Sequence, residues 1–88
     1  MSAERRDRFR RRCMEPVWEE RVDWCGGTVG VWIVAQIRES GVGVAFLESG
    51  YDGRDLHWGL VFLADRGLGD SGAWYRDLAE LVEDCGWC

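Results

Sequence analysis

The chain has 88 residues, of which 47 % are hydrophobic, and it carries a formal net charge of −5. This length provides for one domain with a modest core, and the apolar content with six tryptophans excludes intrinsic disorder. No stretch approaches the ~18 consecutive apolar residues of a membrane span, and no apolar segment follows the basic N-terminus as in a signal peptide. We therefore expect a cytoplasmic protein that binds no membrane and keeps its thiols reduced.

The charge is divided unevenly along a single predicted domain, residues 1–88. Residues 1–12 contain six arginines and two acids, a net charge of +4, whereas residues 13–88 contain five arginines and fourteen acids, a net charge of −9. No repeat or Pro/Gly/Ser-rich linker separates the two parts. We distinguish an arginine-rich helix or arm, residues 1–14, from an acidic α+β body, residues 15–88.

The first predicted elements are helical. Residues 2–14 form the arginine-rich helix or arm, which Pro16 interrupts because proline fits only the first turn of a helix. Over residues 16–25, apolar residues at helical spacing followed by a glycine pair predict a second helix. A strand over the same residues is the alternative prediction, because the apolar side chains of Trp18, Val22 and Trp24 would lie on one side of an extended chain.

Three strands follow. Thr28–Arg38 is rich in β-branched and aromatic residues and apolar on both faces, which is typical of a central strand. Ser40-Gly41 is a turn signal that makes Val42–Glu48 the returning strand of a hairpin. After the turn at Asp52-Gly53, Leu56–Ala64 predicts a third strand in an antiparallel meander.

The last predicted element is an amphipathic helix, capped by Asp70 or Ser71 and running to about Cys85. Its apolar stripe is Trp74, Tyr75, Leu78, Leu81, Val82 and Cys85. The predicted fold class is therefore α+β. N-terminal helix or helices precede a three-stranded antiparallel sheet, which the C-terminal helix covers. Of the tryptophans, we expect Trp32, Trp58 and Trp74 in the core and Trp18, Trp24 and Trp87 partly exposed.

The cysteines offer two kinds of chemistry, both disfavoured. A C-x-x-C pair closes the chain, but it follows a helix, whose negative end disfavours the thiolate that redox catalysis needs. Four cysteines match the ligand number of structural zinc, yet their spacing is unlike two short knuckles. We expect no cofactor and keep a zinc-stabilised module as a lesser alternative, with the ligands Cys13, Cys25, Cys85 and Cys88.

The arginine-rich segment suggests nucleic-acid binding. Its guanidinium groups can grip phosphates, which makes a nucleic-acid-associated regulator the second functional hypothesis. The competing interpretation is a solvated helix with i,i+4 ion pairs, and the acidic body repels phosphate. The candidate residues are Arg5, Arg6, Arg8, Arg10, Arg11 and Arg12.

The leading hypothesis is protein binding, because constellations typical of enzymes are nearly absent. The single histidine, His57, lies on a predicted strand and is interpreted as structural. Acidic side chains on the last helix can imitate nucleic-acid phosphates, and exposed tryptophans can anchor a partner. The candidate residues are Asp77, Glu80, Glu83, Asp84 and Trp87.

The predicted function is that of a small inhibitor or adaptor that docks on a larger protein or nucleoprotein complex. Phage-type inhibitors of bacterial defence, such as anti-CRISPR proteins, and immunity proteins have this general composition. The likeness is compositional, since no family motif is present. Homodimerisation through an exposed strand edge is also compatible with so short a sheet.

Overall fold

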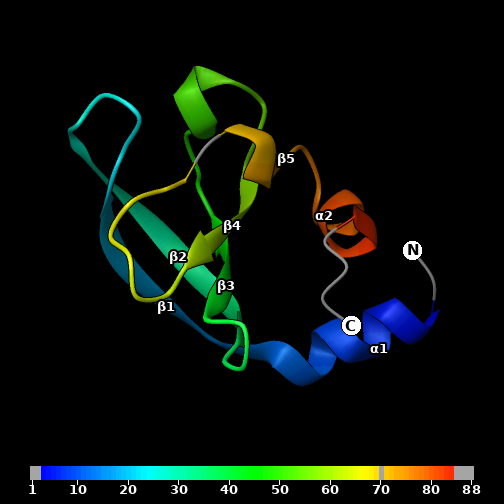
Figure 1. The fold of residues 1–88 in the computed structure, drawn as a ribbon. Helices are drawn as coiled ribbons and strands as arrows, with labels where there is room; N and C mark the ends of the chain where they lie inside the picture. The colour runs from blue at the N-terminus through cyan, green and yellow to red at the C-terminus, as the bar shows by residue number, and fades with distance from the viewer. Residues whose placement is uncertain (1–2, 70, 85–88) are drawn as a thin grey trace.

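The computed structural model describes residues 3–69 and 71–84, with one antiparallel sheet and two α-helices beside it (Figure 1). The strands follow one another across the sheet as β1 (Cys13–Val22), β2 (Thr28–Ile37), β3 (Val42–Phe46), β4 (Trp58–Phe62) and β5 (Trp74–Tyr75). The helices are α1 (Ala3–Arg12) and α2 (Leu78–Asp84), with two short 3-10 helices, η1 (Tyr51–Gly53) and η2 (Ser71–Ala73). Neither described α-helix has the length and apolar character that a membrane crossing requires.

The sheet has five strands, so the predicted three-stranded topology is wrong. The three expected strands are present as β2, β3 and β4, and they form the expected meander. Two further strands extend the sheet at its edges: β1, which was the open alternative to a second helix, and β5, which was not expected. The expected N-terminal helix is α1.

β1 occupies the residues for which a second helix was favoured. It pairs antiparallel with β2, from Val17 opposite Ile33 to Val22 opposite Thr28. β2 is a long apolar strand whose backbone needs a hydrogen-bonded neighbour along each edge, and β3 supplies only one of them. Pairing with β2 therefore outweighs the helical spacing of the apolar residues in β1.

The first half of the predicted C-terminal helix is also wrong. Residues 71–75 form η2 and β5 instead. Trp74 packs directly over Gly59 of β4, where the ring fills the space that a side chain would take. Because the ring is 4 % exposed in this position, burial on the sheet outweighs the helical spacing.

The shorter helix, α2, is capped by a residue that was not expected. Asp77 accepts a hydrogen bond through Oδ1 from the backbone N–H of Glu80 at 2.8 Å. An aspartate in this position satisfies one of the free N–H groups of the first turn. This is the role that we expected of Asp70, which lies outside the described residues, or of Ser71, which belongs to η2.

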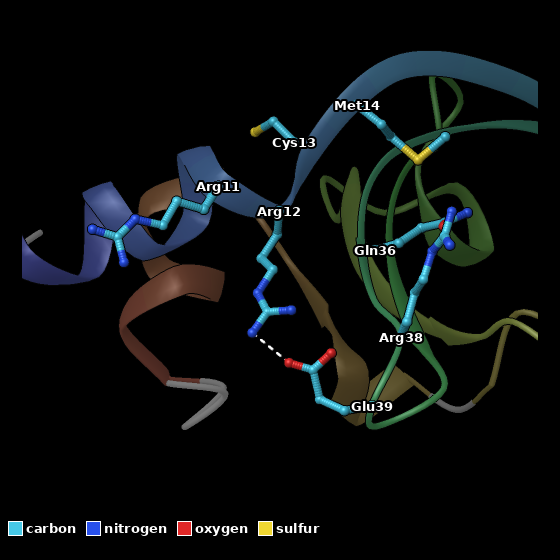
Figure 2. Close-up of a pocket in the computed structure, with 7 residues that line it drawn as sticks. All are labelled: Arg11, Arg12, Cys13, Met14, Gln36, Arg38 and Glu39. Atoms are coloured by element: carbon cyan, nitrogen blue, oxygen red, sulfur yellow. Dashed lines mark ion pairs between the residues drawn. The ribbon is translucent and has the colours of Figure 1, made fainter.

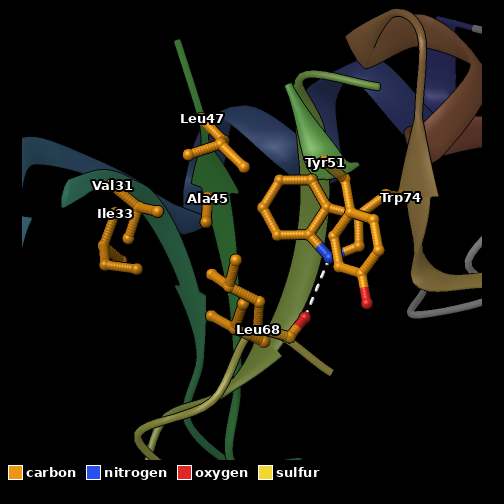
Figure 3. Packing of buried hydrophobic residues seen from close by; sticks show 8 residues of the cluster. Val31, Ile33, Ala45, Leu47, Tyr51, Leu68 and Trp74 are labelled. Carbon is orange, nitrogen blue, oxygen red and sulfur yellow. Dashed lines mark hydrogen bonds between the residues drawn. The ribbon is translucent and has the colours of Figure 1, made fainter. Parts of the chain in front are cut away.

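One hydrophobic cluster fills the inner face of the sheet (Figure 3). The rings of Tyr51 and Trp74 pack with their centroids 5.7 Å apart. The indole N–H of Trp74 donates to the carbonyl oxygen of Leu68 at 2.8 Å, which satisfies the polar atom of a buried ring. The cluster consists of Val31, Ile33, Ala45, Leu47, Tyr51, Val61, Leu68 and Trp74.

A second cluster lies between the outer face of the sheet and the two helices. Phe9 of α1 is buried in it together with residues of α2, so the arginine-rich segment is a helix docked on the body and not a free arm. The buried members are Phe9, Ala35, Val44, Leu81 and Val82.

An irregularity in β2 supplies one of these buried residues. Ile33 pairs with Ala45, whereas Ala35, two residues later, pairs with Val44, the very next residue of β3. The extra residue in β2 moves Ala35 from the inner face to the outer face. β2 therefore contributes buried side chains to both clusters.

The buried side chain of Arg21 ties β1 to the loop after β4. Arg21 is 3 % exposed, and its guanidinium binds the carboxylate of Glu19 at 2.6 Å. Its Nη1 donates to the backbone carbonyls of Phe62 at 3.2 Å, Asp65 at 2.7 Å and Gly67 at 3.0 Å.

Backbone contacts reinforce this connection. The N–H of Val22 donates to the carbonyl oxygen of Arg66 at 2.7 Å, and Val22 forms a parallel bridge with Gly67. The chain that leaves β4 therefore returns to the far edge of the sheet. This contact holds the loop after β4 against the edge strand β1.

Candidate protein-binding surface

An aromatic row crosses the outer face of the sheet, with one side chain from each strand. The register places Trp18 opposite Trp32, Trp32 opposite Phe46, Phe46 opposite Trp58, and Trp58 opposite Tyr75. Directly opposed residues of an antiparallel pair project from the same face, so the five side chains lie in one line. The rings of Phe46 and Trp58 pack with centroids 4.7 Å apart.

The helices cover only one end of this row. Trp58 and Tyr75 pack against the cluster beneath α2, whereas Trp18 is 52 % exposed and Trp32 is 42 % exposed. In Figure 1, α2 lies beside β5, away from the hairpin that β1 and β2 form. The exposed end therefore belongs to this hairpin.

The burial of the tryptophans corrects part of the prediction. Trp74 is in the core as expected, but Trp58 is only half-buried and Trp32 is exposed. Trp18 and Trp24 are exposed as expected. Trp87 lies outside the described residues.

Glu20 and Gly30 complete the exposed end of the row. They are opposite each other in the register, two residues along from the Trp18–Trp32 pair and on the same face. The edge of the Trp18 indole fills the space that a side chain at position 30 would take. Glu20 is exposed. We name Trp18, Glu20, Gly30 and Trp32 the tryptophan patch.

The predicted acidic face of the C-terminal helix is exposed, but two of its members also serve the fold. Asp77 caps α2, and Asp84 accepts a hydrogen bond from the hydroxyl of Tyr75 at 3.1 Å. Glu80 and Glu83 are exposed on the same short helix. Charge reversal of all four residues would therefore disturb the helix as well as any contact with a partner.

All six predicted phosphate-binding arginines, Arg5 included, lie on α1. Arg8 binds Glu4 at 2.7 Å, one of the expected i,i+4 pairs. Arg12 pairs with Glu39, which follows β2. The other candidates, which are exposed, are Arg6, Arg10 and Arg11.

A pocket of about 330 Å³ opens where α1 meets β1 (Figure 2). Figure 2 shows Arg12 turned toward Glu39 and Arg38 beside Gln36, while Arg11 extends away from them. The three guanidinium groups do not converge on one point, so the pocket is not a preformed phosphate site. Its lining residues are Arg11, Arg12, Cys13, Met14, Gln36, Arg38 and Glu39.

Two groups beside this pocket have shifted pKa values. The hydrogen bond from Arg12 lowers the pKa of the Glu39 carboxyl. Burial raises the pKa of the Cys13 thiol, against a smaller opposite effect of Arg10. A thiol with a raised pKa is protonated at neutral pH, which disfavours nucleophilic chemistry.

The predicted zinc ligands are not gathered in the described part of the chain. Cys13 begins β1 and Cys25 follows its far end, so the strand separates them by about 30 Å at 3.3 Å per residue. Ligands of one zinc ion lie only ~2.3 Å from the metal. Within residues 3–69 and 71–84, no three potential ligands form a cluster. Cys85 and Cys88 lie outside the described residues.

His57 makes contacts of a structural kind. Its Nδ1 is 2.9 Å from the carbonyl oxygen of Leu47, and its Nε2 is 3.0 Å from Oδ1 of Asp55. The imidazole also stacks on Phe46, with centroids 6.1 Å apart. His57 therefore joins the end of β3 to the segment before β4.

Comparison of the chain with protein-family models, curated proteins and solved structures found no match. The function is therefore inferred from the geometry of this chain. That geometry adds Trp32 and Glu20 to the candidate residues. Gly30 inside a strand-forming segment was the available sign, because a glycine there can mark the close approach of another group, which in the structure is the indole of Trp18.

Proposed function

We propose that this chain is a small non-enzymatic protein-binding module, an inhibitor or adaptor that docks on a larger protein or nucleoprotein complex. The observation that carries the proposal is the tryptophan patch, where two indoles from paired strands are about half exposed. Tryptophan is strongly enriched among residues whose truncation weakens an interface by 2 kcal/mol or more. Because a tryptophan side chain has only two rotatable torsions, the burial of these indoles would lose little conformational entropy.

The acidic charge supports the same proposal. Residues 13–88 carry a net charge of −9, and such a field accelerates encounter with a basic surface. Glu80 and Glu83 on α2 would add to it by imitating nucleic-acid phosphates. A phage-type inhibitor of a bacterial defence complex, such as an anti-CRISPR protein, or an immunity protein has this combination of small size and acidic charge.

A nucleic-acid-associated regulator is the second candidate. It is supported by the exposure of Arg6, Arg10 and Arg11 on α1, a helix that the buried Phe9 holds against the body. Binding through these residues would weaken steeply with salt. The acidic body opposes it by repelling phosphate at longer range.

The test is affinity capture from an extract of the source cell, with and without nuclease, followed by mass spectrometry. We expect a stoichiometric protein that survives nuclease and is lost from the double variant Trp18→Ala/Trp32→Ala. Trp24→Ala is the matched control, because Trp24 is an exposed indole outside the patch. Capture should continue with this control variant.

Other results of this capture experiment would contradict the role of the tryptophan patch or favour another binding surface. Undiminished capture by the double variant contradicts the role of the patch, and loss of capture by Glu80→Arg would place the contact on α2. Recovery of nucleic acid alone, abolished by salt and by Arg6→Gln/Arg10→Gln/Arg11→Gln, would favour the second candidate. Substitution is preferable to deletion of residues 1–12, because deletion also removes Phe9 from the core.

A further inference from the structure

We propose that the tryptophan patch binds an arginine or lysine side chain presented by a basic segment of the partner protein. This inference rests on the proposed function and assigns a ligand chemistry to its surface. The groups that would bind it are the indoles of Trp18 and Trp32 and the carboxylate of Glu20, which lie around Gly30.

The register brings these groups within reach of a single cation. Glu20 is next to Trp18 on its own strand, on the same face, and diagonal to Trp32 on the paired strand. Directly opposed residues lie about 5 Å apart and diagonal ones about 7–8 Å. A cation is attracted to an indole within about 6 Å of the ring, so a long basic side chain can contact both rings while its charge meets the carboxylate.

The chain itself does not occupy these groups. Among the described residues, no ion pair engages Glu20, and neither Trp18 nor Trp32 packs against another aromatic ring. Arg21, the neighbouring cation on β1, is buried and held by Glu19 and three carbonyls. The exposed parts of both indoles and the carboxylate of Glu20 are therefore accessible to an external group.

The negative charge of Glu20 on this face favours a basic side chain as the ligand. Along the paired segments 18–22 and 28–32, Glu20 is the one charged side chain that the register places on the outer face. An apolar partner would bury this carboxylate without compensation, which is costly. A two-fold dimer through the patch would bring two copies of Glu20 together. A basic side chain satisfies the carboxylate and the indoles at once.

The probe for the test is a short peptide of alternating arginine and glycine, with an otherwise identical citrulline peptide as its neutral control. Binding is followed through the indole N–H resonances of the nitrogen-15-labelled protein. We expect the arginine peptide to shift the Trp18 and Trp32 resonances and the citrulline peptide to bind about tenfold more weakly.

Matched variants separate the patch from general charge attraction. Glu20→Gln and Glu80→Gln remove the same charge, but only Glu20→Gln should weaken binding, by about fivefold. Trp18→Leu keeps an apolar side chain and removes the ring, and it should also weaken binding by about fivefold. The spectrum of each variant verifies that it folds.

Equal binding of the two peptides, or equal weakening by Glu20→Gln and Glu80→Gln, would overturn the inference. If capture of a cellular partner still needs Trp18 and Trp32 in that case, the proposed function stands and only the ligand class falls. A dimer in solution that Trp32→Ala abolishes would also overturn it, because the patch would then bind a second copy.

Discussion

Arg12 and Glu39 form an ion pair between the end of α1 and the turn after β2. Both side chains are partly exposed to water, so the pair contributes little to stability. Its effect on protonation is easier to detect, because the hydrogen bond from Arg12 stabilises the charged form of the Glu39 carboxyl and lowers its pKa.

This pair gives a pH prediction. Because the pKa of Glu39 is lowered by folding, the stability that the pair contributes is fully present above the ordinary glutamate pKa and is lost as the pH falls through the lowered value. We expect Arg12→Gln to raise the pKa of Glu39 toward its ordinary value, measured by carbon-13 NMR titration of the carboxyl group. Arg66→Gln, on a distant loop, is the control. Identical titration of Glu39 in the wild type and in Arg12→Gln would show that the pair is absent in solution.

At the scale of the element, α2 is too short to be stable alone. Isolated helices shorter than ~12–15 residues are marginal in water, and α2 has 7. Its stability comes from the burial of Leu81 and Val82 and from the cap at Asp77. The cap therefore matters more here than in a long helix.

We predict that Asp77→Ala destabilises the protein by about 1 kcal/mol, because the N–H of Glu80 loses its acceptor. For a domain of this size, the melting temperature should fall by about 4–8 °C. Asp77→Ser should restore most of the loss, and Glu80→Ala should stay within about 0.5 kcal/mol of the wild type. Urea denaturation measures all three variants. A serine variant as unstable as the alanine variant would exclude capping as the cause.

The strands that could be predicted are those with strong local signals. β2, β3 and β4 are rich in β-branched and aromatic residues and are separated by glycine turns. β1 and β5 carry weaker signals, and each is fixed by its partner strand. The spacing of Trp74 and Tyr75 fits a helix equally well, and the strand is decided by Gly59, which is distant in sequence and lies beneath the indole.

At the scale of the whole molecule, the length of α2 limits how much of the outer face of the sheet this helix can cover. The expected helix of about 15 residues would extend for about 22 Å, whereas 7 residues extend for about 10 Å. Strands lie about 4.8 Å apart, so an element of this length can span only about two of them, and α2 packs against β4 and β5. The exposure of Trp18 could be expected from its weakly apolar surroundings. The exposure of Trp32 could not be expected, because a helix of the predicted length could reach across the sheet to β2, whereas α2 packs against β4 and β5.

Arg21 links β1, at one edge of the sheet, to the loop that follows β4, and so joins distant parts of the molecule. Its guanidinium is the donor for three backbone carbonyls of the segment from Phe62 to Gly67. Sequence gave no sign of this role, because Arg21 lies in an acidic, exposed stretch and its acceptors are more than forty residues away. Burial of an arginine is tolerated here because its charge meets Glu19 and these carbonyls.

Replacement of Arg21 by methionine should therefore loosen the contact between β1 and the loop after β4. Arg21→Met keeps the apolar stem but leaves the carbonyls without their donor, and we expect a loss of about 3 kcal/mol in the free energy of unfolding. Hydrogen exchange gives a local readout, because the N–H of Val22 is bonded to the carbonyl oxygen of Arg66 and should lose protection first. The control Arg66→Met, at an exposed side chain, should change stability by less than about 0.5 kcal/mol. If Val22 stays protected in Arg21→Met, the backbone contacts alone hold β1 to the loop after β4, and the buried guanidinium is not needed for it.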